Sequence, residues 1–371
     1  MTNLIYLLQV DLNFKDFKFA LLCFVTAFVL TLIFIPPVIA LVKRFKLFDR
    51  PNARKEHTTP IPTFGGLAIV AGTMLSLILW FNFNNHLSVI TFFLSIIVLL
   101  GVGIMDDLKD LSARYKLVIE AGLATLLAIS GIRITSFGGL FGIYDLAITA
   151  QYTFTVLAIV GITNAFNLID GIDGLAGGLG FMSLITLGIF LTLSRDFNNA
   201  LIAFALAGGL LAFLYFNLNP AKIFMGDTGS LVLGFTIAVL CVQLMKVNAF
   251  AARPVVPYIN IFTLGIVLIP VFDTLRVIGT RIWKGRSPFS ADKTHIHHLI
   301  TNNGYSHSLA ARVICVIHGF ILMETFWMKN LKPGVQLLIM AGMMLLFTFL
   351  LSNTGLLKRI IRPKTEQTTV S

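Results

Sequence analysis

The sequence predicts an all-α, polytopic integral membrane protein, and its composition carries that prediction. Of the 371 residues, 57% are apolar and only 12% are charged, and the mean hydropathy is +0.88. Soluble globular domains average about 45–50% apolar and about 25% charged residues. A soluble protein of this composition would lack the polar surface that keeps it dispersed.

No stretch of the sequence is long and polar enough to predict a separate soluble domain. The longest polar stretch, roughly Arg276 to Ala310, is shorter than the 50 or so residues that a domain usually needs. We therefore expect residues 1–371 to form a single transmembrane domain whose chemistry lies on its loops.

The first span is predicted over Phe19–Val42, where 24 consecutive residues carry no charge. This run exceeds the apolar core of a signal peptide, so we expect an uncleaved transmembrane helix. At about 20 residues per span, ten further spans follow: Gly66–Phe83, Val89–Met105, Leu117–Gly131, Tyr152–Phe166, Gly177–Leu193, Ala200–Phe216, Ser230–Met245, Ile259–Phe272, Ala311–Met328 and Val335–Leu351. Pro36, Pro37 and Pro270 fall inside or at the ends of spans, where kinks are tolerated.

The positive charges predict the orientation of these eleven spans. With the N-terminus outside, the cytoplasmic loops and tail, together with Arg312 at the cytoplasmic start of the tenth span, hold 20 of the 28 Lys and Arg residues, and the outside segments hold eight. Because Lys and Arg are enriched on the cytoplasmic side, we expect the N-terminus outside and the C-terminus in the cytoplasm. The cytoplasmic loops are then residues 43–65, 106–116, 167–176, 217–229 and 273–310.

The net charge and the cysteines exclude several classes of function. A charge of +11 could indicate nucleic acid, but that requires a basic face on a folded domain. Anionic lipid head groups or phosphorylated substrates fit better. Cys23, Cys241 and Cys315 lie in apolar runs without C-x-x-C spacing, so we expect small buried hydrophobes.

Between Met105 and Arg312, eight aspartates fall on the predicted cytoplasmic loops or at the cytoplasmic ends of spans. They are Asp106, Asp107, Asp110, Asp170, Asp173, Asp227, Asp273 and Asp292. Single aspartates often cap helices, but eight on one face, several in Gly- and Asn-rich turns at membrane depth, favour a functional site.

Cations share this face with the acids. The basic residues are Lys109, Arg114, Lys116, Lys222, Arg276, Arg281, Lys284, Arg286, Lys293, His295, His297 and His298. Such a mixture is typical of a site for a metal-bridged diphosphate. Mg²⁺ (or Mn²⁺) binds through one or two carboxylates and substrate phosphates. The histidines could instead indicate zinc, but no Cys lies nearby and the acids are ligands for a hard cation.

Four motifs stand out: Gly103–Asp110 (GIMDDLKD), Asn164–Ala176 (NAFNLIDGIDGLA), Phe224–Ser230 (FMGDTGS) and Gly285–His298 (GRSPFSADKTHIHH). Together they resemble the polyprenyl-phosphate N-acetylhexosamine-1-phosphate transferase family, from about Pro62 to His298. The His-Ile-His-His form resembles the branch that uses UDP-N-acetylglucosamine. The muramoyl-pentapeptide branch typically has three consecutive histidines here, so it is the less favoured alternative.

The resemblance implies that undecaprenyl phosphate attacks the sugar-linked phosphorus of UDP-N-acetylglucosamine, with Mg²⁺ or Mn²⁺ required. The products would be UMP and undecaprenyl-diphosphate-N-acetylglucosamine, the first membrane step of a cell-surface polysaccharide pathway in the bacterial inner membrane. The polyprenol length, the exact hexosamine and the oligomeric state, a homodimer included, stay open.

The resemblance also assigns roles to residues of this sequence. It implies that Asp227, with Asn167, holds the metal. Asp106, Asp107, Asp170 and Asp173 are the catalytic candidates, and Lys116, Asn164, Arg286, His295, His297 and His298 the substrate-binding candidates. Adjacent Asp106 and Asp107 cannot face the same direction on a helix, so we expect different roles. A phosphate monoester, with a second pKa near 6, needs no strong base, so we expect positioning before base catalysis.

A secondary transporter is the alternative from another class. It would place carboxylates near mid-span, where Glu120 and Glu324 come closest among the acids of this chain. A scaffold or receptor would not need eight aspartates on one face.

Overall fold

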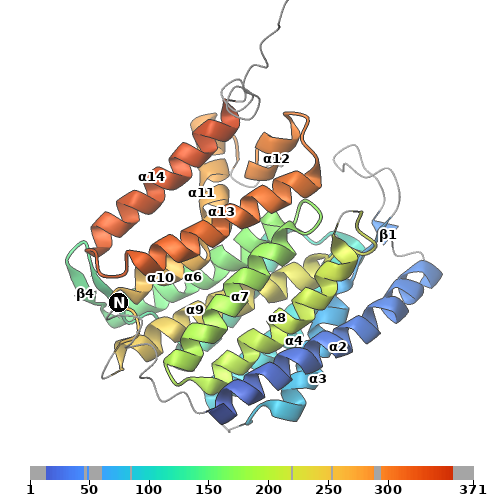
Figure 1. The fold of residues 1–371 in the computed structure, drawn as a ribbon, viewed down its shortest axis with the longest axis horizontal. Helices are drawn as coiled ribbons and strands as arrows, with labels where there is room; N and C mark the ends of the chain where they lie inside the picture. The colour runs from blue at the N-terminus through green and yellow to red at the C-terminus, as the bar shows by residue number, and fades with distance from the viewer. Residues whose placement is uncertain are drawn as a thin grey trace, which may run out of the picture.

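Every stretch that the sequence predicts to span the membrane is largely helical, and one of them is broken into two helices. The computed structural model describes residues 14–45, 48–49, 61–83, 86–218, 220–251, 254–287 and 294–353. Its helices are α2 (Phe14–Phe45), α3 (Gly65–Trp80), α4 (Leu87–Lys109), α5 (Ala113–Ile129), α6 (Ile148–Ile169), α7 (Leu175–Leu193), α8 (Phe197–Asn217), α9 (Asp227–Ala249), α10 (Ile259–Ile266), α11 (Leu268–Trp283), α12 (Ile296–Thr301), α13 (His307–Trp327) and α14 (Pro333–Ser352). Most of the long helices lie side by side in one bundle (Figure 1).

Length and composition make the chain a multi-pass membrane protein. Among the described helices, eight are long and apolar enough to cross a membrane, or nine if α10 and α11 form one span. The 16 residues of α3 extend only about 24 Å, less than the hydrocarbon core of about 30 Å. The count of eleven spans and their orientation therefore stay predictions.

The predicted span Ile259–Phe272 is not one straight helix. It divides into α10 and α11, which meet at an angle of 76°. Pro270 has no N–H to donate to the carbonyl of Ile266, and its ring collides with a carbonyl four residues earlier. The helix therefore breaks at Val267, and Pro270 falls in the first turn of α11, where it is tolerated.

Helix α9 is the buried centre of the bundle and packs against α3, α4, α6 and α7. Close contacts at its first turn depend on glycine. A Cβ on Gly103 of α4 would lie 2.5 Å from Thr228 Cα, and one on Gly66 of α3 would lie 2.1 Å from the Gly229 nitrogen. These glycines bring α3 and α4 against the start of α9, where the Phe224–Ser230 motif lies.

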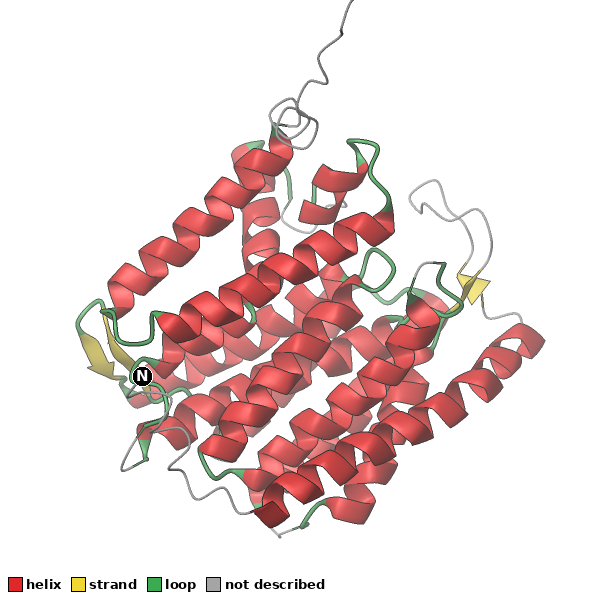
Figure 2. Ribbon diagram, in the orientation of Figure 1, coloured by secondary structure: helices red, strands yellow, loops and turns green. Residues whose placement is uncertain are grey.

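Two small antiparallel sheets accompany the helices (Figure 2). Strands β1 (Phe48–Asp49) and β2 (Ile61–Pro62) pair at the end of the bundle that holds α12. Strands β3 (Ser136–Leu140) and β4 (Ile143–Asp145) form a hairpin at the opposite end. The sequence did not predict either sheet.

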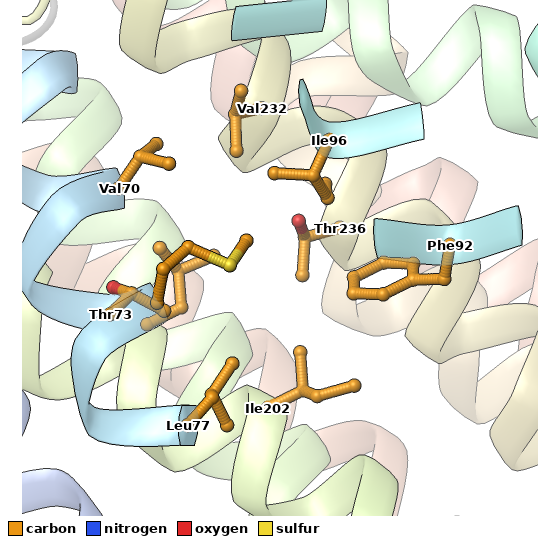
Figure 3. Close-up of a pocket in the computed structure, with 10 residues that line it drawn as sticks. Val70, Thr73, Leu77, Phe92, Ile96, Ile202, Val232 and Thr236 are labelled. Atoms are coloured by element: carbon orange, nitrogen blue, oxygen red, sulfur yellow. The ribbon is translucent and has the colours of Figure 1, made fainter. Parts of the chain in front are cut away.

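A small apolar pocket lies inside the bundle between α3, α4, α8 and α9 (Figure 3). Its lining residues are Val70, Thr73, Met74, Leu77, Phe92, Ile96, Ile202, Leu206, Val232 and Thr236. None of them carries a charge, so this pocket is not where the aspartates act.

Candidate active site

The candidate site forms around the first turn of α9, and Asp107 shapes that turn. The carboxylate of Asp107 accepts hydrogen bonds from the backbone N–H of Asp227 at 2.9 Å and of Thr228 at 3.1 Å. It also accepts a short hydrogen bond from the Thr228 hydroxyl. Gly226 precedes this turn with φ +70°, and a Cβ there would lie 2.6 Å from Asp107 Oδ2. Asp107 therefore caps the N-terminus of α9.

Lys116 joins the two other acids of this cluster. Its Nζ donates to Asp227 Oδ2 at 2.7 Å and to Asp106 Oδ2 at 2.9 Å. The other oxygen of Asp106 accepts from the backbone N–H of Leu111 at 2.7 Å, which fixes the turn between α4 and α5. Asp106 and Asp107 thus face different partners, as their adjacency on a helix predicts.

Helix α6 contributes amide and carboxyl groups to the same cluster. Asn167 Nδ2 donates to Ser230 Oγ at 2.9 Å, and the Asn167 side chain also hydrogen-bonds Asp227. Asp170 follows the last residue of α6. Burial, and then the charges of Asp227, Asp107 and Asp173, raise the pKa of Asp170 to about 7. Asp170 therefore lies in a field of negative charge that a cation would relieve.

Asn164 lies one turn before Asn167 on α6 and reaches a different partner. Its Nδ2 donates to Val160 O at 2.9 Å and, in a shorter hydrogen bond, to Glu120 Oε2 on α5. Within the described part of the chain, Asn164 therefore lies next to the cluster but is not hydrogen-bonded to it. Its side-chain partner is the buried carboxyl group of Glu120 on α5.

Asp173 instead ties two loops together. Its Oδ2 accepts from the backbone N–H of Ala221 at 3.1 Å. Asn217 links the same loops, because its Oδ1 accepts from the Gly174 N–H at 2.8 Å and its Nδ2 donates to Ile223 O at 2.9 Å. Asp173 therefore holds the loop before α9 against the turn at residues 170–174, a contact suited to a structural role.

The histidines lie on the short helix α12 and at its start, and Asp273 of α11 holds the first of them, His295. Asp273 Oδ2 lies 2.8 Å from His295 Nδ1, and Oδ1 accepts from the Ile296 N–H at 2.9 Å. Arg276 donates to the same carboxylate at 2.9 Å. These hydrogen bonds hold α12 against α11, the helix that follows the bend. His295 therefore has a structural partner in Asp273.

His297 makes the contact between α12 and the rest of the site. Its ring lies nearly parallel to that of His295, with 5.8 Å between centroids, and 4.2 Å from that of His298. A Cβ on Gly171 would lie 2.9 Å from His297 Nε2, so the Asp-Gly-Ile-Asp-Gly turn receives this imidazole. Burial, and then the charges of His298 and His295, lower the pKa of His297 to about 3. The ring is therefore neutral at physiological pH.

Arg286 is not brought into the cluster. It lies just beyond α11, where its backbone N–H donates to Arg281 O at 2.9 Å and its side chain is exposed. Asp292 and Lys293 of the same loop fall outside the residues that the structure describes, as do most of residues 46–60 and the tail beyond Asn353.

The donor set fits a hard divalent cation. Within the described ranges, no three His, Cys, Asp or Glu side chains gather closely enough to hold a metal by themselves. Mg²⁺ does not require such a set, since it keeps water and takes substrate phosphates as ligands. Asp227 supplies carboxylate oxygens beside the Lys116 ammonium, which already occupies a cation position between two carboxylates. The Asn167 side chain hydrogen-bonds Asp227 and can offer its amide oxygen.

Several of these contacts were not predicted from the sequence. The pairing of Glu120 with Asn164 was missed, although Glu120 lies four residues after Lys116 and so on the same helix face. The capping roles of Asp107 and Asp273 were missed too, because they depend on which helices meet.

The comparisons with known proteins agree with this geometry. Residues 89–245 match the model of glycosyl transferase family 4. A Bacillus subtilis (strain 168) protein named "Probable undecaprenyl-phosphate N-acetylglucosaminyl 1-phosphate transferase" is 33% identical over 350 residues, 92% of this chain and 95% of its own. Proteins named "Undecaprenyl-phosphate alpha-N-acetylglucosaminyl 1-phosphate transferase" are 33% identical in Salmonella typhi, covering 80% of each chain, and 30% identical in Escherichia coli (strain K12), covering 76% of each. With this coverage and identity, and with the motifs meeting at the start of α9, the chain belongs to glycosyl transferase family 4.

Proposed function

We propose that this protein transfers N-acetylglucosamine 1-phosphate from UDP-N-acetylglucosamine to undecaprenyl phosphate. The observation that carries this proposal is the meeting of separate motifs at one place. Asp106, Lys116 and Asp227 are joined by ion pairs, and the histidine loop touches the Asp170–Gly174 turn through His297. The printed names of the relatives contain the same acceptor and the same sugar.

The reaction forms one phosphorus–oxygen bond and breaks another. An oxygen of undecaprenyl phosphate bonds to the phosphorus that carries the sugar, and the bond from that phosphorus to the bridging oxygen breaks to release UMP. The lipid phosphate is largely dianionic near neutral pH, so it attacks without a strong base. Lys116 supplies positive charge where phosphates meet, and Asp106 holds its ammonium in place.

A magnesium ion fits this proposal, with Asp227 and Asn167 as the protein groups that would hold it. When bound, it would neutralise the negative charge that develops on the diphosphate during transfer. The chain's own residues orient the partners: Asp107 fixes the turn from which Asp227 projects, and Ser230 holds the amide of Asn167.

The proposal also predicts the membrane in which the protein lies and the side on which its site faces. The protein would lie in the bacterial inner membrane with the candidate site on the cytoplasmic side, where nucleotide-sugars are made. Residues 1–371 would act as a single transmembrane catalytic domain. The positive-inside distribution of Lys and Arg supports this orientation.

Purified protein incubated with undecaprenyl phosphate, Mg²⁺ and a panel of UDP-sugars tests the proposal. We expect UMP release with UDP-N-acetylglucosamine, and none with UDP-N-acetylmuramoyl-pentapeptide. Release only with the pentapeptide substrate would assign the protein to the muramoyl branch. Absence of release with every UDP-sugar would contradict the proposal.

A further inference from the structure

Glu120 is a buried carboxyl group that no motif of the sequence explains. It lies one turn after Lys116 on α5, and its residue is only 1% exposed. Its Oε2 accepts the hydrogen bond from Asn164, while its Oε1 is buried and has no hydrogen-bond partner among the residues that the structure describes. Burying a carboxyl group with so few partners is costly, and such groups within membrane proteins point to function.

The contacts of Asn164 fix the orientation of its amide. One side-chain atom contacts both Glu120 Oε2 and Val160 O, the latter at 2.9 Å. A main-chain carbonyl can only accept a hydrogen bond, so the shared atom must be the amide nitrogen, and these two acceptors use both of its protons. The carbonyl oxygen is what Asn164 has left to offer to a ligand.

This pair connects the two helices that supply the cluster. On α5, Lys116 and Glu120 are four residues apart and share a face; on α6, Asn164 and Asn167 are three apart and share a face. Lys116 contacts Asp227, and Asn167 hydrogen-bonds Asp227 and Ser230. The Glu120–Asn164 hydrogen bond therefore links α5 and α6 one helical turn away from the groups that contact Asp227.

We propose that Glu120 is a positioning residue for the nucleotide-sugar: it holds Asn164 so that its carbonyl oxygen faces the substrate as a hydrogen-bond acceptor. The matching substrate group is an N–H or O–H, which the uracil ring, the ribose and the N-acetylhexosamine carry. The phosphate oxygens only accept when ionised, so they cannot use this contact. The inference rests on the proposed transferase function. It adds a residue, Glu120, that determines whether Asn164 accepts or donates in its hydrogen bond with the substrate.

Two variants of nearly equal size separate positioning from stability. Glu120→Gln keeps an oxygen that can accept from Asn164, whereas Glu120→Met removes both oxygens and leaves only a weakly accepting sulfur. We expect Glu120→Met to raise the KM for UDP-N-acetylglucosamine about tenfold, as for the loss of one hydrogen bond. The KM for undecaprenyl phosphate and the Tm should stay near their wild-type values. Glu120→Gln should recover most of the loss.

Inhibition by UMP then locates the substrate group. A parallel rise in the inhibition constant of UMP places it on the nucleotide, and an unchanged constant places it on the sugar. In an Asn164→Ala background, Glu120→Met should have no further effect, because the two residues act through one contact. Glu324→Met, on α13, is the matched control for removing a carboxyl group from a membrane helix.

Three results would overturn the inference while leaving the transferase function intact. They are an unchanged KM for UDP-N-acetylglucosamine in active Glu120→Met, equal defects in Glu120→Gln and Glu120→Met, and additive effects of Glu120→Met and Asn164→Ala. Wild-type protein that releases no UMP from UDP-N-acetylglucosamine would instead refute both the function and the inference.

Discussion

Lys116 Nζ lies 2.7 Å from Asp227 Oδ2, although 111 residues separate the two in sequence. The same ammonium lies 2.9 Å from Asp106 Oδ2, so one positive charge is shared by two carboxylates. The contact places a cation that belongs to the chain against the residue proposed to hold a metal ion. Lys116 and a bound divalent cation would therefore both neutralise Asp227.

Lys116→Met should make the site bind divalent cations more tightly while transfer slows. Two unit charges at 4 Å interact by about 4 kcal/mol at an effective dielectric constant of about 20. If about a third of this repulsion between Lys116 and the bound ion is lost in the variant, the affinity for Mn²⁺ rises about tenfold. Electron paramagnetic resonance of Mn²⁺ measures this without turnover. Lys109→Met, which removes an exposed lysine from the same face, is the control. Equal Mn²⁺ affinity in Lys116→Met and wild type would show that Lys116 does not compete with the cation.

Asp227→Asn should slow UMP release by at least about 10²-fold at saturating Mg²⁺. The substitution keeps the size of the side chain but removes the charge that stabilises a bound cation, a loss of several kcal/mol in the transition state. Asp110→Asn is the matched control, because Asp110 is exposed and an αL conformation suits asparagine. Near-normal turnover of Asp227→Asn would remove Asp227 from the metal site.

The sequence predicts the helices of this protein well because long apolar runs leave the membrane-embedded backbone few alternatives. It also predicts that Asp106 and Asp107 differ in role, since neighbours on a helix point apart. The partners of these acids could not be predicted. That Asp107 caps α9 depends on Gly103 letting α4 approach Thr228, a contact between segments 125 residues apart in sequence. Pro270 inside a predicted span allows a kink, but the sequence alone did not fix the break at Val267 or its angle of 76°.

The neutral His297 should make the folded state sensitive to acid. Its folded pKa, about 3, lies below the 6.5 of an unperturbed imidazole, so the unfolded state takes up more protons between these values. The contribution of His297 to the free energy of unfolding is fully present above about pH 6.5. It decreases as the pH falls toward 3, by at most about 1.4 kcal/mol per pH unit.

Thermal unfolding in detergent between pH 6.5 and 5 measures this effect. His297→Asn should lose less stability on acidification than wild type. His86→Asn, which removes an exposed histidine before α4, should keep the wild-type slope. Identical slopes for all three proteins would mean that His297 is not held neutral by its surroundings.

Arg286→Lys should weaken use of UDP-N-acetylglucosamine more than use of undecaprenyl phosphate. A guanidinium can form two parallel hydrogen bonds with a diphosphate, whereas an ammonium is a single point charge. Arg286 is exposed beyond α11, so the contact would form only when the donor binds. Kinetics with each substrate varied in turn decide this, with Lys284→Arg as control. A defect confined to the lipid substrate would move this loop away from the donor.

The predicted orientation places the β3–β4 hairpin outside the cell and α12 in the cytoplasm. These elements lie at opposite ends of the bundle (Figure 1), so one labelling experiment tests both. Tyr144, 67% exposed on β4, and Asn302, exposed after α12, are suitable positions for single cysteines. A membrane-impermeant maleimide should label Tyr144→Cys in intact spheroplasts and Asn302→Cys only after lysis. Cys23 and Cys241 are buried, so wild-type protein reports the background from Cys315. Labelling of Asn302→Cys in intact spheroplasts would place the histidine loop outside, where UDP-sugars from the cytoplasm cannot reach it, and would contradict both the predicted orientation and the proposed function.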